Sequence, residues 1–264
     1  MAHRLLRRPC GLSGSGLTAC LSRGVWSRLL AAASVVACSA TGALGQVFTT
    51  VPLAGVANAR LQAAWPTFTG VPYPEGNQTW GNVPWSLGSG GNNTWFSRDA
   101  TGANPRTVTI PINVAQATTA YTLMGTWQGN TSQSLYVELE FTGSAGATFT
   151  TRFFGGVHIR DWFNGRYTNN VTSPNTTANV YSVNIGPNGG TGTSRLDMQR
   201  IDLPTAFESQ SLVSLTIRDF GADPSGTFGQ RSFIYGLTVS AIPTPSAAVV
   251  LGLGGLMAAR RRRC

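Results

Sequence analysis

A short run of polar and aromatic residues, Arg160–Arg166, has the side chains best suited to contact a ligand. The indole of Trp162 could stack on the apolar face of a sugar ring, and neighbouring polar groups could hydrogen-bond the ring hydroxyls. We therefore predict a carbohydrate contact made by Arg160, Asp161, Trp162, Asn164 and Arg166. The alternative for Trp162 is a packing role, which is the commoner use of Trp in a β-sandwich.

The sequence indicates no set of catalytic side chains. His158 and Asp161 could form a base and its orienting acid, but a spacing of three on a strand puts side chains on opposite faces. Glycoside hydrolysis needs two facing carboxylates, and no pair among the ten acids is singled out by its spacing. Asp197 and Asp202 are expected to face solvent beside buried Leu196, Ile201 and Leu203. We predict no catalytic residue, no metal ligands and no cofactor, with a structural calcium site in the Asp- and Asn-bearing loops left open.

Strands are the elements expected to position these residues. Apolar side chains alternate with polar ones in several runs, and Gly, Asn, Pro and Ser clusters separate the runs. The predicted strands are Thr107–Ile112, Tyr121–Trp127, Leu135–Phe141, Phe149–Phe153, Tyr181–Ile185, Val213–Ile217 and Phe233–Val239. Pro111 places its strand at a sheet edge or a bulge, and only Leu53–Ala64 looks weakly helical. The pattern predicts an all-β domain over 46–240, folded as a single jelly-roll sandwich rather than two smaller modules.

Short motifs within this domain resemble a known family. The segment Thr79–Leu87 resembles the strand-entry motif of galactose-binding-like domains, notably the carbohydrate-binding module called NPCBM. Segments in the order of that family follow at Glu138–Gly143, His158–Trp162, Arg195–Leu203 and Ser214–Phe220. The resemblance implies a galactose-binding-like sandwich with a glycan as ligand.

The net charge of +9 is concentrated at the two ends of the chain. Five Arg precede residue 46 and four more are Arg260–Arg263, so the middle has ten Arg against ten acids. A neutral domain lacks the basic field that phosphate backbones require, which argues against nucleic acid as a partner. The four Cys also lie outside the middle, at Cys10, Cys20, Cys38 and Cys264, so the domain is stabilised without a disulfide.

The first 45 residues read as a secretory signal peptide. A polar, Arg-bearing start precedes the apolar run Leu29–Ala43, and Ala43-Leu44-Gly45 predicts cleavage between Gly45 and Gln46. Lipidation of Cys38 and a twin-arginine signal at Arg7-Arg8 are weaker alternatives.

The last 24 residues, 241–264, read as a sorting or anchoring tail. Pro243, Thr244 and Pro245 precede an apolar helix predicted over 247–259, and Arg260, Arg261, Arg262 and Arg263 follow it. Thirteen residues span about 20 Å as a helix, short of the roughly 30 Å of bilayer hydrocarbon, so flanking residues would have to complete the span. The order of features resembles the PEP-CTERM signal of bacterial exported proteins. That resemblance implies recognition by an exosortase-like sorting enzyme and membrane attachment, and an ordinary anchor helix is the alternative.

Together these features predict an exported, envelope-associated protein that is not an enzyme. Its expected partner is an extracellular polysaccharide or other glycan, or it contributes to the extracellular matrix. Two alternatives stay open at this point: a polysaccharide-active hydrolase or lyase, and a purely structural surface protein.

Overall fold

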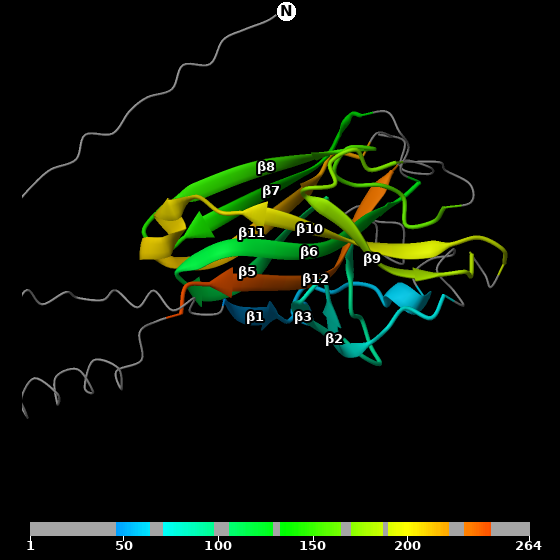
Figure 1. Cartoon of the computed structure of the whole chain (residues 1–264), viewed down its shortest axis with the longest axis horizontal. Helices are drawn as coiled ribbons and strands as arrows, with labels where there is room; N and C mark the ends of the chain where they lie inside the picture. The colour runs from blue at the N-terminus through cyan, green and yellow to red at the C-terminus, as the bar shows by residue number, and fades with distance from the viewer. Residues whose placement is uncertain are drawn as a thin grey trace, which may run out of the picture. The chain divides into compact units, whose positions relative to one another are not determined.

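The computed structural model describes residues 46–63, 71–97, 106–128, 133–164, 170–186, 190–221 and 230–243 (Figure 1). These residues belong to one compact unit of the chain, which spans 42–264. Several predicted features lie outside the described residues: Gly45, Arg166, Thr244, Pro245, the apolar run 247–259 and Arg260–Arg263.

The described elements are antiparallel strands and short 3-10 turns, which confirms the all-β prediction. One sheet has the order β1-β12-β6-β10-β9, with β4 also paired to β12, and a second has the order β5-β11-β7-β8. Strands β2 and β3 form a separate hairpin. The bounds are β1 Val47–Val51, β2 Gly76–Trp80, β3 Val83–Leu87, β4 Trp95–Phe96, β5 Thr107–Ala115, β6 Ala117–Trp127, β7 Leu135–Gly143, β8 Thr148–Phe154, β9 Thr177–Val183, β10 Ser194–Asp202, β11 Ser211–Asp219 and β12 Arg231–Ala241. The 3-10 turns are η1 Leu61–Ala63 and η3 Thr205–Ser209, so the expected helical character of Leu53–Ala64 is limited in the described part to η1.

The two sheets pack face to face around a hydrophobic core, which gives the unit its β-sandwich character. Strand β7 shows why: Val137, Leu139 and Phe141 are fully buried and face the other sheet, as alternation along a strand requires. Pro111 lies in β5, which is an edge strand, and faces the irregularity where β11 shifts register between Leu212 and Ser214. Both parts of the Pro111 prediction are therefore confirmed.

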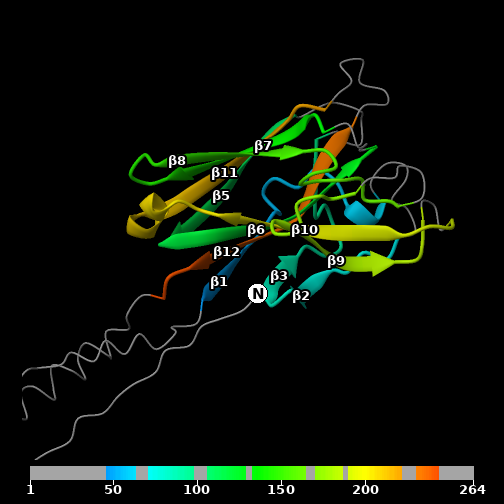
Figure 2. The ribbon, with the colours of Figure 1, turned by 45° about the horizontal axis from the view of Figure 1, so that its top comes forward.

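Strand β12 is buried over all eleven of its residues because it is covered on both faces. One face looks into the sandwich and the other looks toward the β2–β3 hairpin, which lies on the far side of the six-stranded sheet (Figure 2). A register shift at Tyr235 and Gly236 changes which residues face which side. Before the shift Phe233 and Tyr235 face the hairpin, and after it Leu237 and Val239 face the sandwich core.

The hairpin is fixed by its turn and by its contacts with the sheet. Gly81 and Asn82 both have positive φ, at 57° and 63°, which is the geometry of a type I′ turn. Thr238 of β12 donates a hydrogen bond of 2.6 Å to the carbonyl oxygen of Pro84. These contacts close a second core between the hairpin and the sheet, built around Trp85, Leu123, Phe233 and Tyr235.

The first and last strands of the unit are neighbours. Strand β1 pairs with β12 so that Val47 faces Ala241, and the start of β1 and the end of β12 therefore lie at the same end of the sheet. No helix in the part of the chain that the structure describes is long and apolar enough to cross a membrane, and the predicted tail helix lies outside that part.

Candidate functional site

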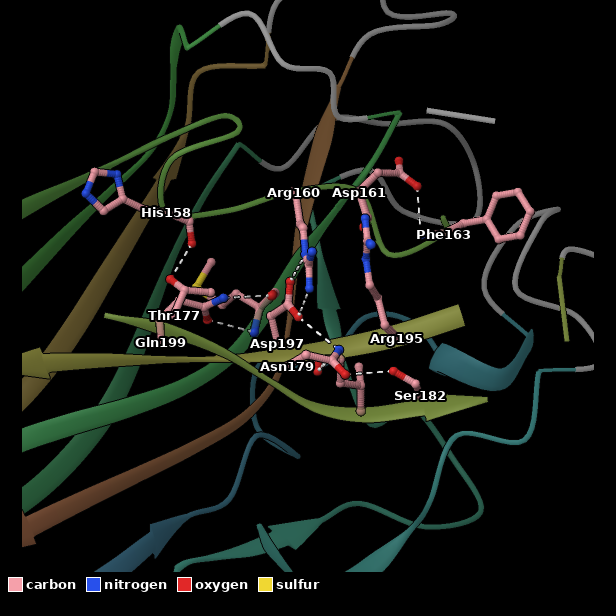
Figure 3. A network of polar contacts seen from close by, with 12 residues as sticks. His158, Arg160, Asp161, Phe163, Thr177, Asn179, Ser182, Arg195, Asp197 and Gln199 are labelled. Atoms are coloured by element: carbon pink, nitrogen blue, oxygen red, sulfur yellow. Dashed lines mark hydrogen bonds and ion pairs between the residues drawn. The ribbon is translucent and has the colours of Figure 1, made fainter. Parts of the chain in front are cut away.

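The segment that the sequence singled out is wedged between two strands of the larger sheet (Figure 3). Strands β6 and β10 pair as far as Met124 and Asp197. Next to that point the Gln199 side chain accepts a hydrogen bond from the Met124 amide and donates one to the Met124 carbonyl oxygen, both at 3.1 Å. Beyond it, residues 160–164 fill the gap through bridges from Asp161 to Thr126 and from Phe163 to Ser194. The segment thus acts as a short extra strand that joins β6 to β10.

Trp162 does not present a face to a ligand in this arrangement. Its side chain is only 3% exposed and belongs to the core under the hairpin. Its ring meets the edge of Tyr73 at 6.5 Å and lies 5.5 Å from Phe163. The expectation of sugar stacking by Trp162 is therefore corrected to the packing alternative, because stacking requires an accessible ring face.

Arg160 is held in a buried ion pair. Its Nε and Nη2 donate to the two carboxylate oxygens of Asp197 at 2.6 and 2.9 Å, and Asn179 donates to the same carboxylate at 3.1 Å. Asp197 is 4% exposed, so the expectation that it faces solvent is wrong. The Asp197 carboxylate can be buried because two N–H groups of one guanidinium donate to both of its oxygens. Asp202, five residues on, is exposed as expected, and Leu196, Ile201 and Leu203 are buried as expected.

Asp161 lies beside a second buried guanidinium. Its Oδ1 accepts a hydrogen bond of 2.8 Å from the Phe163 amide, and its carbonyl oxygen accepts one of 3.0 Å from Arg195. Burial lowers the pKa of Arg195, and the nearby Arg160 lowers that pKa further. Burial raises the pKa of Tyr73 well above its ordinary value, and the charge of Asp161 adds to that rise. Sequence reasoning did not find Arg195 or Tyr73, since both are far along the chain from residues 160–164.

His158 and Asn164 complete the predicted set. The His158 ring stacks on Phe153 at 5.8 Å, and its Nδ1 accepts a hydrogen bond of 3.3 Å from the Phe154 amide. Burial lowers the pKa of this imidazole. His158 is the last residue of a turn at 156–158, and the contacts of the imidazole are structural. Asn164 is exposed at the end of the wedge, and Arg166 lies outside the described residues.

A further buried acid was missed by sequence reasoning. Asp219, at the end of β11, is 4% exposed and accepts hydrogen bonds from Ser97, from the Gly221 amide and from both the amide and the hydroxyl of Ser232. These donors come from three separate parts of the chain. Asp219 therefore joins β11, β12 and the end of β4, and no local pattern could have indicated this.

Metal binding has no support in the described ranges, where no three His, Cys, Asp or Glu side chains group together. The structural calcium site that the sequence analysis left open is still open, because several Asp- and Asn-bearing loops lie outside those ranges.

One aromatic pair, Trp80 and Tyr181, lies near the surface. Trp85, Trp95 and Trp127 are buried, and Trp65 lies outside the described residues. Trp80 is half-buried at the tip of the hairpin, and its ring lies 6.0 Å from that of Tyr181, also half-buried, on β9. Among the described Trp residues, Trp80 is thus the one with a partly accessible ring.

No protein-family model matches the chain, and no curated protein is significantly similar to it.

Proposed function

We propose that this protein is an exported, envelope-associated protein that is not an enzyme and that binds an extracellular polysaccharide through its β-sandwich. The finer fold that we propose is a galactose-binding-like jelly roll. The tail is proposed as a sorting signal for an exosortase-like enzyme, which would attach the protein to the membrane before any processing.

A binding role rather than a catalytic one is supported by the pairing of the acids with other protein groups. Apart from Glu208, each acid in the described ranges accepts a hydrogen bond or an ion pair from another protein group. A hydrolase needs one carboxyl group free to give a proton and another free to act as a base or nucleophile. An acid held by Arg or by amide donors suits neither task.

The glycan part of the proposal draws on the hairpin tip. Trp80 and Tyr181 form a tilted pair, with 38° between their planes and both rings partly accessible. The Tyr181 hydroxyl is held by a 2.7 Å hydrogen bond to the carbonyl oxygen of Pro72, which fixes the orientation of the ring. Rigid aromatic rings contact the apolar faces of sugars at little cost in conformational entropy.

The envelope part draws on the pairing of Val47 with Ala241. A tail held at the membrane would place this end of the sheet nearest to the bilayer. The opposite end, where β12 begins at Arg231 and β6 ends at Trp127, would then point away from it.

Binding and catalysis can be measured in the same samples. The full-length protein in mild detergent is mixed with neutral and anionic polysaccharides, and we measure both pull-down and the release of reducing ends. We expect binding without product, and binding that weakens in Trp80→Ala but not in Phe220→Ala, an exposed aromatic control at a separate place. Release of reducing ends that is lost when one acid is changed would instead favour an enzyme. Concentration-dependent oligomers with no glycan bound would favour the purely structural alternative.

Attachment is tested by deleting residues 242–264 and fractionating the cells. We expect the full-length protein in the membrane fraction and the deleted form outside it. An unchanged membrane fraction would refute the anchoring role of the tail.

A further inference from the structure

A groove runs along the edge of the hairpin, beside the first strand of the sheet. Its volume is about 460 Å³, and it is lined by Thr50 of β1, by Asn77, Gln78 and Thr79 of β2, and by Pro84 and Trp85 of β3. This volume lies in the range of sites that hold small ligands or a few units of a polymer.

Most of the polar side chains that line the groove make no internal hydrogen bond in the described structure, in contrast to several buried or half-buried Asn side chains of the domain. Asn58, Asn93 and Asn179 each donate internal hydrogen bonds. Within the described ranges, by contrast, the side chains of Asn77, Thr79 and Thr50 make no such bond, and Asn77 and Thr79 are exposed. Gln78 donates from Nε2 to the Glu75 carbonyl oxygen at 2.9 Å, which leaves its amide oxygen available as an acceptor.

Every side chain that lines the groove is uncharged. The nearby Glu75 carboxylate lies 3.1 Å from the Arg60 guanidinium, so the charges of these two side chains cancel each other. A ligand with a formal charge would find no counter-ion here, whereas hydroxyl groups would find both donors and acceptors. Half-buried Pro84 supplies apolar surface for C–H groups. This combination suits a neutral, hydroxyl-rich ligand.

The groove is also held rigid. The turn at Gly81 and Asn82 sets the register of the hairpin, and β3 is fastened to the sheet through the bond from Thr238 to Pro84. Tyr235 adds a second fastening by donating to the carbonyl oxygen of Pro74 at 2.6 Å. A preformed groove loses little entropy when it binds. Trp85, in contact with this frame, is 1% exposed, and its indole N–H has no hydrogen-bond partner in the described structure, so a donor is left unused.

From these observations we infer that the groove lined by Thr50, Asn77, Gln78, Thr79, Pro84 and Trp85 is a binding subsite for a neutral polysaccharide chain. The inference rests on the proposed glycan-binding function and names the surface that performs it.

The test uses the full-length protein with soluble hexasaccharides of a neutral β-glucan, a neutral xylan and the anionic polymer alginate. Titration calorimetry compares wild type with the double variant Asn77→Ala/Thr79→Val. The matched control is Thr148→Val/Thr150→Val, which changes two exposed polar residues on β8 of the other sheet. We expect the groove variant to bind the neutral hexasaccharides about tenfold more weakly, because two side-chain hydrogen bonds are lost, and the control to bind like wild type.

The outcomes separate the two claims. Neutral binding that is equal in wild type and in the groove variant would overturn the groove and leave glycan binding intact. A wild type that binds none of the hexasaccharides would overturn the proposed function itself. Tighter binding of alginate than of the neutral chains would overturn the argument from charge. Equal thermal midpoints of the variants and wild type show that the fold is unchanged, and Gln78→Ala provides a second groove variant if they differ.

Discussion

Replacing Asp197 by Asn should destabilise the domain far more than the same replacement at Asp202. The two residues lie on β10, and each pairs with an Arg, so they differ mainly in their surroundings. Asp197 and Arg160 have side chains 4% and 17% exposed, whereas Asp202 and Arg200 are 67% and 52% exposed. The comparison therefore isolates the effect of burial.

The size of the effect follows from what the substitution leaves behind. Asn keeps one acceptor oxygen but carries no charge, so the guanidinium of Arg160 loses its counter-ion and one of its two acceptors, while it stays close to Arg195. Removing one partner of a buried pair costs roughly 3–5 kcal/mol, and the partial exposure of Arg160 suggests a loss near 3 kcal/mol. For a domain of this size that loss lowers the thermal midpoint by about 6–12 °C. Loss of the exposed pair should cost less than about 1 kcal/mol.

Thermal and urea unfolding, followed by Trp fluorescence, measure both variants against wild type. Raising the salt concentration should shrink the small effect of Asp202→Asn and leave the effect of Asp197→Asn nearly unchanged, since buried charges are screened less. If the two variants lost equal stability, the Arg160–Asp197 pair would be solvated in solution. The wedge between β6 and β10 would then need another explanation.

Three further predictions concern packing, backbone and pH. Gly236→Ala would bring a methyl group within 2.9 Å of a ring carbon of Trp85, and we expect a loss of roughly 1–3 kcal/mol in urea unfolding; no loss would mean that the hairpin is not packed on β12. Asn82→Ala puts a side chain that disfavours positive φ into the turn, and a loss of about 1 kcal/mol in the same assay is expected, whereas an unchanged midpoint would contradict the type I′ geometry. Burial lowers the pKa of His158, so the unfolded chain binds its proton more readily, and stability should fall as the pH drops below about 6.5. His158→Gln should flatten that part of the stability profile, and an unchanged slope would assign it to other groups.

The strands with one solvated face were predictable because their side chains alternate. Val137, Leu139 and Phe141 of β7 illustrate this, since they are fully buried and the residues between them are partly exposed. Strand β12 could be predicted as a strand, but its assignment of faces could not, because the shift at Tyr235 and Gly236 reverses the alternation. Short β2 was harder still, since its polar residues resemble a loop, and its partner β3 and the turn at Gly81 and Asn82 define it.

The local segment of the candidate site could be predicted from the sequence, but its long-range contacts could not. The sequence drew attention to residues 160–164 as a meeting of polar and aromatic groups, but it could not show that Arg160 and Asp161 bond inward and that Trp162 is buried. Asp197 and Arg195 are brought to Arg160 and Asp161 by the pairing of β10 with the wedge, and such long-range pairing has no local signal. For the same reason the groove at Asn77 and Thr79 was not anticipated, although its neutral lining agrees with the absence of net charge in the domain.

The position of β12 also sets when the larger sheet can form. This strand comes last in the described chain, yet it lies between β1 and β6 and also pairs with β4. Until residues 231–241 have emerged from the ribosome, β1 and β4 have no partner and one long edge of β6 is bare. Contacts so distant in sequence form slowly. The larger sheet is thus incomplete until β12 has been synthesised, whereas the sheet of β5, β11, β7 and β8 does not depend on that strand.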